Sequence, residues 1–307
     1  MSVVIPSYNE EETLEKLYNA ICSCSEDLIK NLLIDSFDIW FVDDGSTDNS
    51  LGILKKICNN DPKCHVIVFR RNFGKAAALA AGFEHAQGNI IITMDADFQD
   101  DPVDFKRFIE KLDEGFDLVS GWKKVRNDPL EKRFPSKLFN KVTACLSGVN
   151  LHDFNCGFKA YRKEAAKALI IYGEFHRYLP VLAARYGFRS GEISVTNHKR
   201  EFGHSKYGWK RYHRGLFDSI STSFLLHYSD RPMYFFGKWA LVSFSLAILS
   251  TIAGFFPPLS IIAWIGAMFL VVICVFLFAC GLLANLIVDY FHWNIKTAAH
   301  IREVIGK

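Results

Sequence analysis

The chain has 307 residues, enough for one or two domains with a full hydrophobic core, and half of its residues are hydrophobic. Its formal net charge of +3 is too small to indicate a nucleic-acid-binding protein. Its eight cysteines are scattered, and the closest pair, Cys22 and Cys24, lacks the spacing of a zinc ribbon, so we expect neither a disulfide framework nor a zinc site.

Residues 1–198 alternate short β-rich runs with helical patterns, which predicts an α/β domain with an open, mostly parallel sheet. The expected strands are residues 2–6, 37–43, 65–70, 89–95, 117–121 and 192–199. The expected helices are residues 11–24, 49–60, 75–86, 102–114, 135–146, 163–171 and 178–186.

Polar and acidic clusters follow four consecutive strands of this pattern. They begin at Pro6 (PSYNEE), Asp43 (DDGSTD), Arg71 (RNFGK) and Asp95 (DADFQDD). Because ligands of open α/β sheets bind at the carboxyl ends of the strands, the clusters predict one binding site. Each cluster alone is also typical of a turn with a helix cap, but four in succession are harder to explain in that way.

The cluster after the fourth strand indicates a metal ion. Asp95 and Asp97 are separated by one residue, and their carboxylates repel each other unless a cation or a proton intervenes. Oxygen ligands favour Mg²⁺ or Mn²⁺, which usually keep water and share the phosphates of a substrate. An ion on Asp97 would neutralise a diphosphate leaving group.

A long uncharged stretch lies toward the end of the chain. Residues 239–288 contain no Asp, Glu, Lys or Arg, whereas about 20 apolar residues span a bilayer. The pair Pro257-Pro258 divides the stretch and predicts two transmembrane helices, at about residues 233–256 and 261–290. The alternative is a hairpin buried inside a large soluble protein.

The flanks of this stretch predict its orientation. Residues 199–238 carry eight Lys and Arg against three Asp and Glu, and the loop between the spans carries no charge. The positive-inside rule therefore places both termini in the cytoplasm, including the tail at residues 291–307, and predicts a multi-pass protein of the inner membrane. No signal peptide is expected, because the first apolar run stops at Pro6. The basic, aromatic segment 199–232 suits a helix in the headgroup layer, or an amphipathic helix packed on the first domain.

The order of motifs resembles that of a known enzyme family. PSYNEEE, DDGSTDNS, NFGKAAALAAGF, DADFQDDP, NCGFKAYR and REFGHSKY follow one another as in glycosyltransferase family 2 with the GT-A fold. Within that family the chain is similar to polyisoprenyl-phosphate glycosyltransferases, such as dolichol-phosphate mannose synthase and bacterial undecaprenyl-phosphate glucosyltransferases. The resemblance covers about residues 1–230, and the two-helix tail matches the bacterial branch. It implies a GT-A nucleotide-sugar-binding domain with helices on both faces of its twisted sheet.

The resemblance also implies roles for individual residues. The expected donor-binding residues are Pro6, Tyr8, Glu10 and Asp43 at the nucleoside, Lys75 near the diphosphate, and Asp95 and Ala96. The expected metal ligands are Asp97 and Gln99, with Asp95 beside them, and the expected catalytic residues are Asp153, Asp97, Arg200 and Lys206. Arg200 and Lys206 match the positions that meet the acceptor phosphate, and we add Arg126 and Arg133 as candidate cations for it.

The chemistry of the acceptor refines the role of Asp153. A phosphate monoester is largely dianionic at neutral pH, so its oxygen is already a nucleophile and needs no base. Asp153 is therefore expected to orient the sugar or to stabilise positive charge at the anomeric carbon. The alternative is a carboxylate that caps the following turn. Direct attack predicts inversion, with a β-linked product from an α-linked donor.

The expected function is transfer of a hexose to an undecaprenyl-type phosphate, with UDP-glucose as the leading donor and GDP-mannose or another UDP-sugar as alternatives. The second span ends in DYFH where the relatives tend to carry Gly-Glu-Tyr, which leaves a homo-oligomer open. The non-enzyme alternative is a degenerate glycosyltransferase that serves as a scaffold in the bilayer.

Other functional classes fit the sequence poorly. A processive polysaccharide synthase needs a Gln-x-x-Arg-Trp motif, and the only glutamines are Gln87 and Gln99. No G-x-G-x-x-G follows the first strand, as a dehydrogenase would require, and Trp209 stands where a P-loop has Lys. A transporter is disfavoured because residues 239–288 hold no Asp, Glu, Lys or Arg, and the next charged residue is Asp289.

Overall fold

The computed structural model of the chain divides into two compact units, residues 1–222 and 223–307. The structure describes residues 1–124, 148–173, 175–198, 231–257 and 260–292, together with residues 144, 224 and 228. The helix expected at 135–146, most of the segment 199–232 and the tail from 293 therefore lie outside the described residues.

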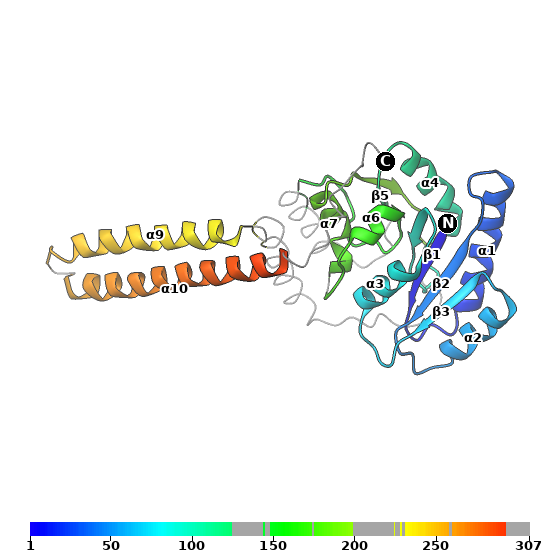
Figure 1. The fold of residues 1–307 in the computed structure, drawn as a ribbon, viewed down its shortest axis with the longest axis horizontal. Helices are drawn as coiled ribbons and strands as arrows, with labels where there is room; N and C mark the ends of the chain where they lie inside the picture. The colour runs from blue at the N-terminus through cyan, green and yellow to red at the C-terminus, as the bar shows by residue number, and fades with distance from the viewer. Residues whose placement is uncertain are drawn as a thin grey trace. The chain divides into compact units, whose positions relative to one another are not determined.

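The first unit is built on a seven-stranded sheet with the strand order β3-β2-β1-β4-β6-β5-β7 (Figure 1). The strands are β1 (Ser2–Ser7), β2 (Asp38–Asp43), β3 (Cys64–Val68), β4 (Ile90–Thr93), β5 (Leu118–Trp122), β6 (Lys159–Arg162) and β7 (Ser190–Ser194). Among these described strands, the pairs that β6 forms with β4 and β5 are antiparallel, and the other pairs are parallel. The predicted mostly parallel sheet is confirmed, but the sequence pattern did not predict β6, whose four residues run directly into the next helix.

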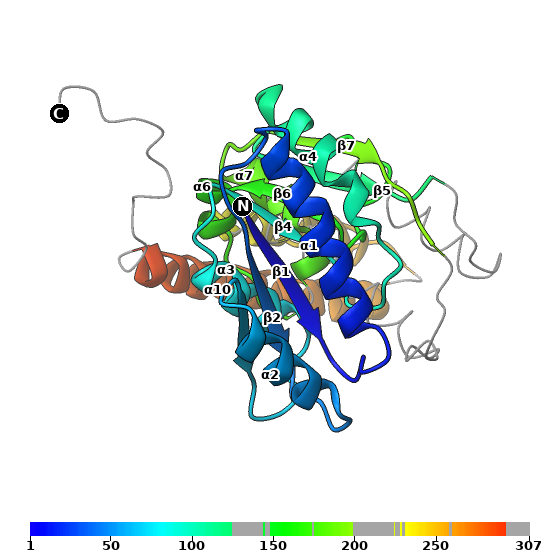
Figure 2. The ribbon, with the colours of Figure 1, turned by 90° about the vertical axis from the view of Figure 1, so that its right-hand side faces the viewer.

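Helices cover both faces of this sheet (Figure 2). One face carries α1 (Leu14–Lys30), α2 (Ser50–Asn60) and α4 (Phe105–Asp113), which follows the short helix η1 (Pro102–Asp104). The other face carries α3 (Lys75–His85), α6 (Lys163–Ala168) and α7 (Leu179–Arg185), which follows η2 (Phe175–Arg177). The strands supply both cores by alternation, because successive side chains point to opposite faces of a sheet.

The alternation is visible in the two central strands. Val3 and Ile5 of β1 pack in the core under α1, whereas Val4 packs in the core under α3. In β6, Ala160 joins the first core and Tyr161 the second. The same period of two places Lys159 on the face that α3 covers. A charged residue therefore enters the apolar layer beneath α3, next to the carboxyl edge of the sheet.

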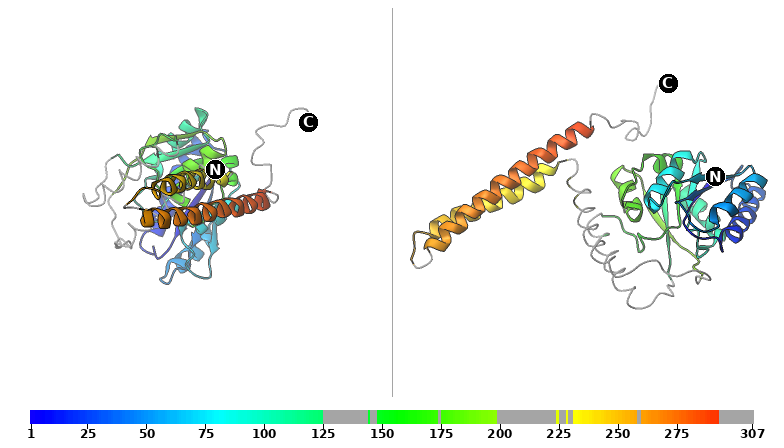
Figure 3. Two further views of the ribbon diagram at one scale, coloured as in Figure 1. Left: turned by 90° about the vertical axis from the view of Figure 1, so that its left-hand side faces the viewer. Right: turned by 90° about the horizontal axis from the view of Figure 1, so that it is seen from below.

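The second unit is a helical hairpin of α9 (Pro232–Ala253) and α10 (Ser260–His292) (Figure 3). The apolar parts of the two helices are 22 and 29 residues long, with mean hydropathies of 1.6 and 3.0, so both are long and apolar enough to cross a membrane. Few of their side chains are buried, unlike those of a core helix in a soluble protein. A 2.7 Å hydrogen bond from Ser250 Oγ to the carbonyl oxygen of Ala263 links the helices.

Candidate active site

Strand topology gathers the expected site at one edge of the sheet. Strands β2, β1 and β4 are parallel neighbours, so the loops after Asp43, Ser7 and Thr93 emerge side by side. Because β6 runs antiparallel to β4, with Thr93 opposite Lys159, the loop that precedes β6 reaches the same edge. That loop carries Asp153. The structure therefore brings Asp153 to the cluster after β4, although 56 positions separate Asp153 from Asp97 in the sequence.

The loops after β1 and β2 are bonded to each other. The backbone N–H of Asn9 donates to Ser46 Oγ at 3.0 Å, and Asn9 Oδ1 accepts from the backbone N–H of Thr47 at 2.8 Å. The backbone N–H of Glu10 donates to Ser50 Oγ at 2.9 Å. These bonds hold the expected nucleoside residues Tyr8 and Glu10, both partly buried, beside the end of β2.

Asp43 at the end of β2 offers a hydrogen-bond acceptor. Its side chain is buried, and Oδ2 accepts from the backbone N–H of Ser46 at 3.3 Å. Its Oδ1 is also buried and has no hydrogen-bond partner within the described part of the chain. A buried acceptor without a donor is costly, so an N–H of a ligand would stabilise it. Pro6, the fourth expected nucleoside residue, is partly buried in β1, in register with Val42.

Asp44 connects the end of β2 to the start of α3. Its carboxylate accepts from the backbone N–H groups of Phe73 at 2.7 Å and Gly74 at 2.9 Å. Burial raises the pKa of Asp44 above its ordinary value, although these two donors oppose the rise. Gly45 follows with φ +70°, and a Cβ there would lie 2.5 Å from the backbone carbon of Arg71. The connection positions Lys75, the first residue of α3.

Lys75 forms an ion pair with Asp95 after β4. Burial favours the neutral form of Asp95, but the ammonium of Lys75 outweighs it and holds the pKa of the carboxyl at about 2. The side chains of Lys75 and Asp95 remain 29% and 33% exposed, so the pair lies at the edge of the site. Gly157 borders it: an added Cβ would lie 2.6 Å from Asp95 Oδ1. Lys75 and Asp95, two of the expected donor-binding residues, therefore form an ion pair that borders the loop carrying Asp153.

The remaining residues of the expected metal motif lie in a tight turn after Asp95. The carbonyl oxygen of Ala96 accepts from Thr13 Oγ1 at 2.7 Å, and Asp97 Oδ1 accepts from the backbone N–H of Gln99 at 3.2 Å. Phe98 between them has φ 56°. Asp97 and Gln99 provide the hard oxygen atoms that Mg²⁺ and Mn²⁺ prefer. Among the described residues, no group of three His, Cys, Asp or Glu residues suited to a metal occurs.

Residues that follow β5 and β7 also bind the loop after β4, through an ion pair and hydrogen bonds. Lys123 forms a 2.6 Å ion pair with the buried Asp100, whose pKa burial raises despite that cation. The carbonyl oxygen of Gln99 accepts from the backbone N–H of His198 at 2.8 Å, and His198 Nε2 lies 2.9 Å from Asp101 Oδ2. The sequence pattern did not single out Lys123 or His198, because neither belongs to a motif.

Asp153 is almost fully buried. Its Oδ1 accepts from the backbone N–H of Asn155 at 3.2 Å, and its carbonyl oxygen accepts from Ser120 Oγ at 3.2 Å. The first bond is the turn cap that the alternative interpretation predicts. The carboxylate therefore caps its turn, and its loop reaches Asp95 through Gly157. The role of Asp153 toward a sugar stays a prediction.

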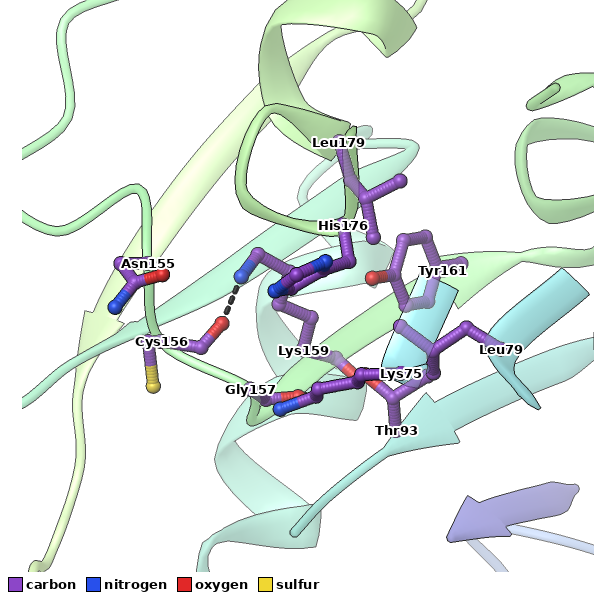
Figure 4. A pocket seen from close by; sticks show the side chains of 10 residues that line it. All are labelled: Lys75, Leu79, Thr93, Asn155, Cys156, Gly157, Lys159, Tyr161, His176 and Leu179. Atoms are coloured by element: carbon purple, nitrogen blue, oxygen red, sulfur yellow. Dashed lines mark hydrogen bonds between the residues drawn. The ribbon is translucent and has the colours of Figure 1, made fainter. Parts of the chain in front are cut away.

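Residues of α3, β4, β6, η2 and α7 and of the loop before β6 enclose a small cavity (Figure 4). It is lined by Lys75, Leu79, Thr93, Asn155, Cys156, Gly157, Lys159, Tyr161, His176 and Leu179. Apart from Lys75, sequence reasoning named none of these as site residues. The sequence could have indicated Lys159, because a lysine among apolar and aromatic residues of a buried strand is unusual. Nothing in the sequence indicates His176 as a site residue, because it lies 101 positions from Lys75 and belongs to no motif.

The four cations expected at the acceptor phosphate, Arg126, Arg133, Arg200 and Lys206, lie outside the described residues. Their assignment stays a prediction.

Comparison with known proteins assigns the chain to a family. The model of Glycosyl transferase family 2 matches residues 2–170. Dodecaprenyl-phosphate galacturonate synthase of Rhizobium johnstonii is 36% identical over 254 residues, which cover 81% of this chain and 74% of that protein. Undecaprenyl-phosphate 4-deoxy-4-formamido-L-arabinose transferase of Shewanella sediminis is 35% identical over 224 residues, which cover 72% of this chain and 66% of that protein.

Solved structures agree on the fold. Glucosyl-3-phosphoglycerate synthase of Mycobacterium tuberculosis, crystallised with Mn²⁺, UDP and phosphoglyceric acid, aligns with a TM-score of 0.54 at 18% identity and covers 73% of this chain and 77% of that one. The expected GT-A fold is thereby confirmed. The chain belongs to glycosyl transferase family 2 and is a glycosyltransferase of the same group as the polyprenyl-phosphate enzymes that it resembles.

Proposed function

We propose that the chain transfers a hexose from a UDP-sugar to polyprenyl phosphate with inversion at the anomeric carbon, and that UDP-glucose is its leading donor. One observation carries the proposal. A sheet edge suited to a nucleoside diphosphate and two helices apolar enough to cross a membrane occur in one chain. A soluble donor and a lipid acceptor need that combination, and both relatives named above act on polyprenyl phosphates.

The donor would bind along the edge of the sheet. Asp43 offers its unpartnered Oδ1 to an N–H of the base, as an acceptor that a uracil ring can satisfy. Lys75 is the first residue of α3, and its ammonium would lie beside the diphosphate of a bound donor. Asp97 and Gln99 would hold Mg²⁺ or Mn²⁺, which supplies positive charge to the diphosphate as it leaves.

The reaction needs one displacement. An oxygen of the acceptor phosphate forms a bond to the anomeric carbon, and the bond from that carbon to the diphosphate oxygen breaks, so that UDP leaves with the electron pair. No proton has to be removed from a phosphate dianion. The buried Asp153 then serves to orient the sugar or to stabilise positive charge at the anomeric carbon.

The identity of the sugar is the finer part of the proposal. The two relatives are named for a galacturonate and for a formamido-arabinose, so enzymes about equally similar to this chain differ in their sugar. GDP-mannose and other UDP-sugars are therefore the alternatives to UDP-glucose. For the acceptor phosphate we keep Arg126, Arg133, Arg200 and Lys206 as proposed contacts, and for the chain we propose an inner-membrane location with the catalytic unit and both termini in the cytoplasm.

The test uses the purified full chain in neutral detergent with polyprenyl phosphate and a panel of nucleotide sugars. We expect a lipid-linked sugar from UDP-glucose, and loss of its formation in EDTA. Asp97→Asn removes a charge while keeping the shape of the side chain, and should lower the rate by roughly 10³-fold or more. Full activity of Asp97→Asn, or of the enzyme in EDTA, would contradict the metal assignment.

A second outcome separates the scaffold alternative from an enzyme. If the chain neither transfers sugar to the lipid nor hydrolyses any donor of the panel, it is not an active glycosyltransferase.

A further inference from the structure

Three buried polar side chains form a row across neighbouring strands of the sheet. Ser120 of β5 and Thr93 of β4 both lie opposite Lys159 of β6 in the strand register. Because opposite residues of neighbouring strands point to the same face, all three side chains lie on the face that α3 covers. The three residues are at most 2% exposed. Polar groups in such an apolar layer are costly unless each has a hydrogen-bond partner.

The two outer members of the row bind the two ends of one loop. We call residues 153–157, which precede β6, the Asp153 loop. Ser120 Oγ donates to the carbonyl oxygen of Asp153 at 3.2 Å. Thr93 Oγ1 donates to the carbonyl oxygen of Gly157 at 2.9 Å. The loop therefore crosses the sheet from β5 to β4 with its first and last carbonyl groups bound to the row.

Lys159 binds the middle of the same loop. Its ammonium donates to the carbonyl oxygens of Phe154, at 3.2 Å, and Cys156 (Figure 4). One ammonium has three N–H groups, so it can bind two carbonyl groups, which a single hydroxyl donor could not. The charge has a cost, because burial lowers the pKa of Lys159. The two bonds, and the negative charge of the nearby Asp153 and Asp95 side chains, offset that cost.

The row thereby determines where Asp153 lies relative to the expected donor site. At the end of the loop, Gly157 lies against Asp95: an added Cβ would lie 2.6 Å from Asp95 Oδ1. At its start, the Asp153 carboxylate is bound within the loop by the N–H of Asn155. A loop fixed at its start, middle and end keeps one distance between Asp153 and Asp95. Displacement of a reacting group by about 1 Å can lower a rate by about 100-fold.

We infer that Lys159 is a positioning residue for sugar transfer, because it holds the Asp153 loop at the Asp95 edge of the sheet. Ser120 and Thr93 support it by binding the two ends of the loop. The inference rests on the proposed function, because the role of Asp153 toward the sugar belongs to that proposal. Lys159 acts through the backbone of the loop and needs no contact with the donor.

Hydrogen–deuterium exchange of the full chain in neutral detergent tests whether the row holds the loop. Lys159→Met keeps an unbranched side chain but removes the ammonium, so the amides of residues 153–157 should exchange about 10-fold faster or more. Exchange at residues 43–50, after β2, should stay unchanged. The matched control is Lys167→Met, since Lys167 Nζ also donates to a backbone carbonyl, that of Glu84, at 2.7 Å. Unchanged exchange of the Asp153 loop in Lys159→Met would overturn the inference.

Ser120→Ala keeps the inference testable if Lys159→Met does not fold. It removes one neutral hydrogen bond at the start of the Asp153 loop, and exchange of the loop should again become faster. Its control is Ser190→Ala, because Ser190 Oγ donates to a different backbone carbonyl, that of Pro180, at 3.0 Å. The same exchange of the loop in both serine variants would count against the row in the same way.

Kinetics separate positioning from a general loss of structure. With UDP-glucose, or the donor of the panel that proves active, kcat should fall by about 10-fold or more in Lys159→Met. The Kd for UDP, measured by titration calorimetry, should stay unchanged, because the expected nucleoside residues lie on the loops after β1 and β2. Lys167→Met should keep both values. An equal loss of kcat and of UDP affinity in Lys159→Met would indicate a merely structural role and overturn the inference.

Asp153→Asn shows whether Lys159 acts through Asp153. This variant should itself lower kcat, and Lys159→Met should then cause little further loss, whereas independent effects would multiply. Ser120→Ala replaces Lys159→Met in this cycle if the latter does not fold. Multiplied losses in an active enzyme would overturn the inference. Absence of transfer by the wild type from any nucleotide sugar would instead overturn the proposed function, so the two failures are distinguishable.

Discussion

At the residue scale, the ionisation of Asp95 depends most on Lys75, with Lys123 and Lys159 acting in the same direction. Burial alone would raise the pKa of this carboxyl, and the ion pair with Lys75 reverses that effect. The carboxylate is thereby kept charged at the edge of the site, where Gly157 leaves it room. A carboxylate with a lowered pKa contributes stability that is present above its ordinary pKa of 3.8 and is lost as the pH falls toward about 2.

Lys75→Met should therefore shift the acidic side of the pH profile of kcat/KM to higher pH. Without the ammonium, the pKa of Asp95 rises because burial is offset less, so protonation begins at a higher pH. Beyond a general loss of rate, we expect the acid limb of the kcat/KM profile to move to higher pH. The control is Lys30→Met, which breaks the exposed 3.0 Å pair of Lys30 with Asp27. It should leave the profile unchanged, and an unmoved limb in Lys75→Met would show that this pair does not control Asp95.

At the scale of elements, the site depends on bonds between loops of successive β–α units. Thr13 in the first loop holds the carbonyl oxygen of Ala96 in the fourth, and Asn9 is bonded to Ser46 and Thr47 in the second. Parallel strands bring such loops together because all their carboxyl ends lie on one edge. The antiparallel β6 adds the loop of Asp153, which arrives at this edge from the opposite direction.

Asp44→Asn tests the hydrogen bonds by which the Asp44 carboxylate, at the end of β2, binds the backbone before α3. An amide oxygen replaces only one of the two carboxylate oxygens, so one of the N–H groups of Phe73 and Gly74 then faces the amide NH₂. We expect a loss of about 1–3 kcal/mol in the free energy of unfolding, measured in urea, and weaker donor binding because Lys75 follows this loop.

The matched control for this variant is Asp48→Asn. Asp48 also accepts two backbone N–H groups, from Ser50 at 3.0 Å and Glu11 at 3.3 Å, but it is only partly buried, whereas Asp44 is buried, so water can reach Asp48 and replace the lost bond. If Asp44→Asn and Asp48→Asn lower the free energy of unfolding equally, the burial of Asp44 does not add to the strength of its hydrogen bonds.

At the scale of the whole molecule, the chain combines a GT-A unit with a hairpin of two apolar helices. In the orientation that we propose from the positive-inside rule, both termini lie in the cytoplasm and the turn between the helices lies on the other side. This orientation would bring a cytoplasmic donor and a lipid phosphate to the same leaflet.

Cysteine labelling checks the orientation. Ser260→Cys lies at the first residue of α10 and should react with an impermeant maleimide added outside intact cells. Ser36→Cys lies on the exposed surface of the catalytic unit and should react only after permeabilisation. The unaltered chain supplies the background from its own cysteines. The reverse pattern, or the same pattern for both positions, would contradict the hairpin model.

The sequence by itself determined the features that depend on local composition. Fifty uncharged residues are enough to define two spans, and the order of strands and helices is enough to define a mostly parallel sheet. The polar clusters at Ser7, Asp43 and Asp95 could be combined into one site, because parallel strands present their carboxyl ends together.

Only the tertiary structure decided what depends on contacts between distant segments. Strand β6 was not predicted, since its four residues carry no periodic signal before α6 begins. Its direction places Lys159 and Tyr161 beside Thr93, and η2 then brings His176 to the same cavity. A lysine, a tyrosine and a histidine have no meaning as a group in the sequence. They line one cavity because strand pairing fixes which face of the sheet each side chain occupies.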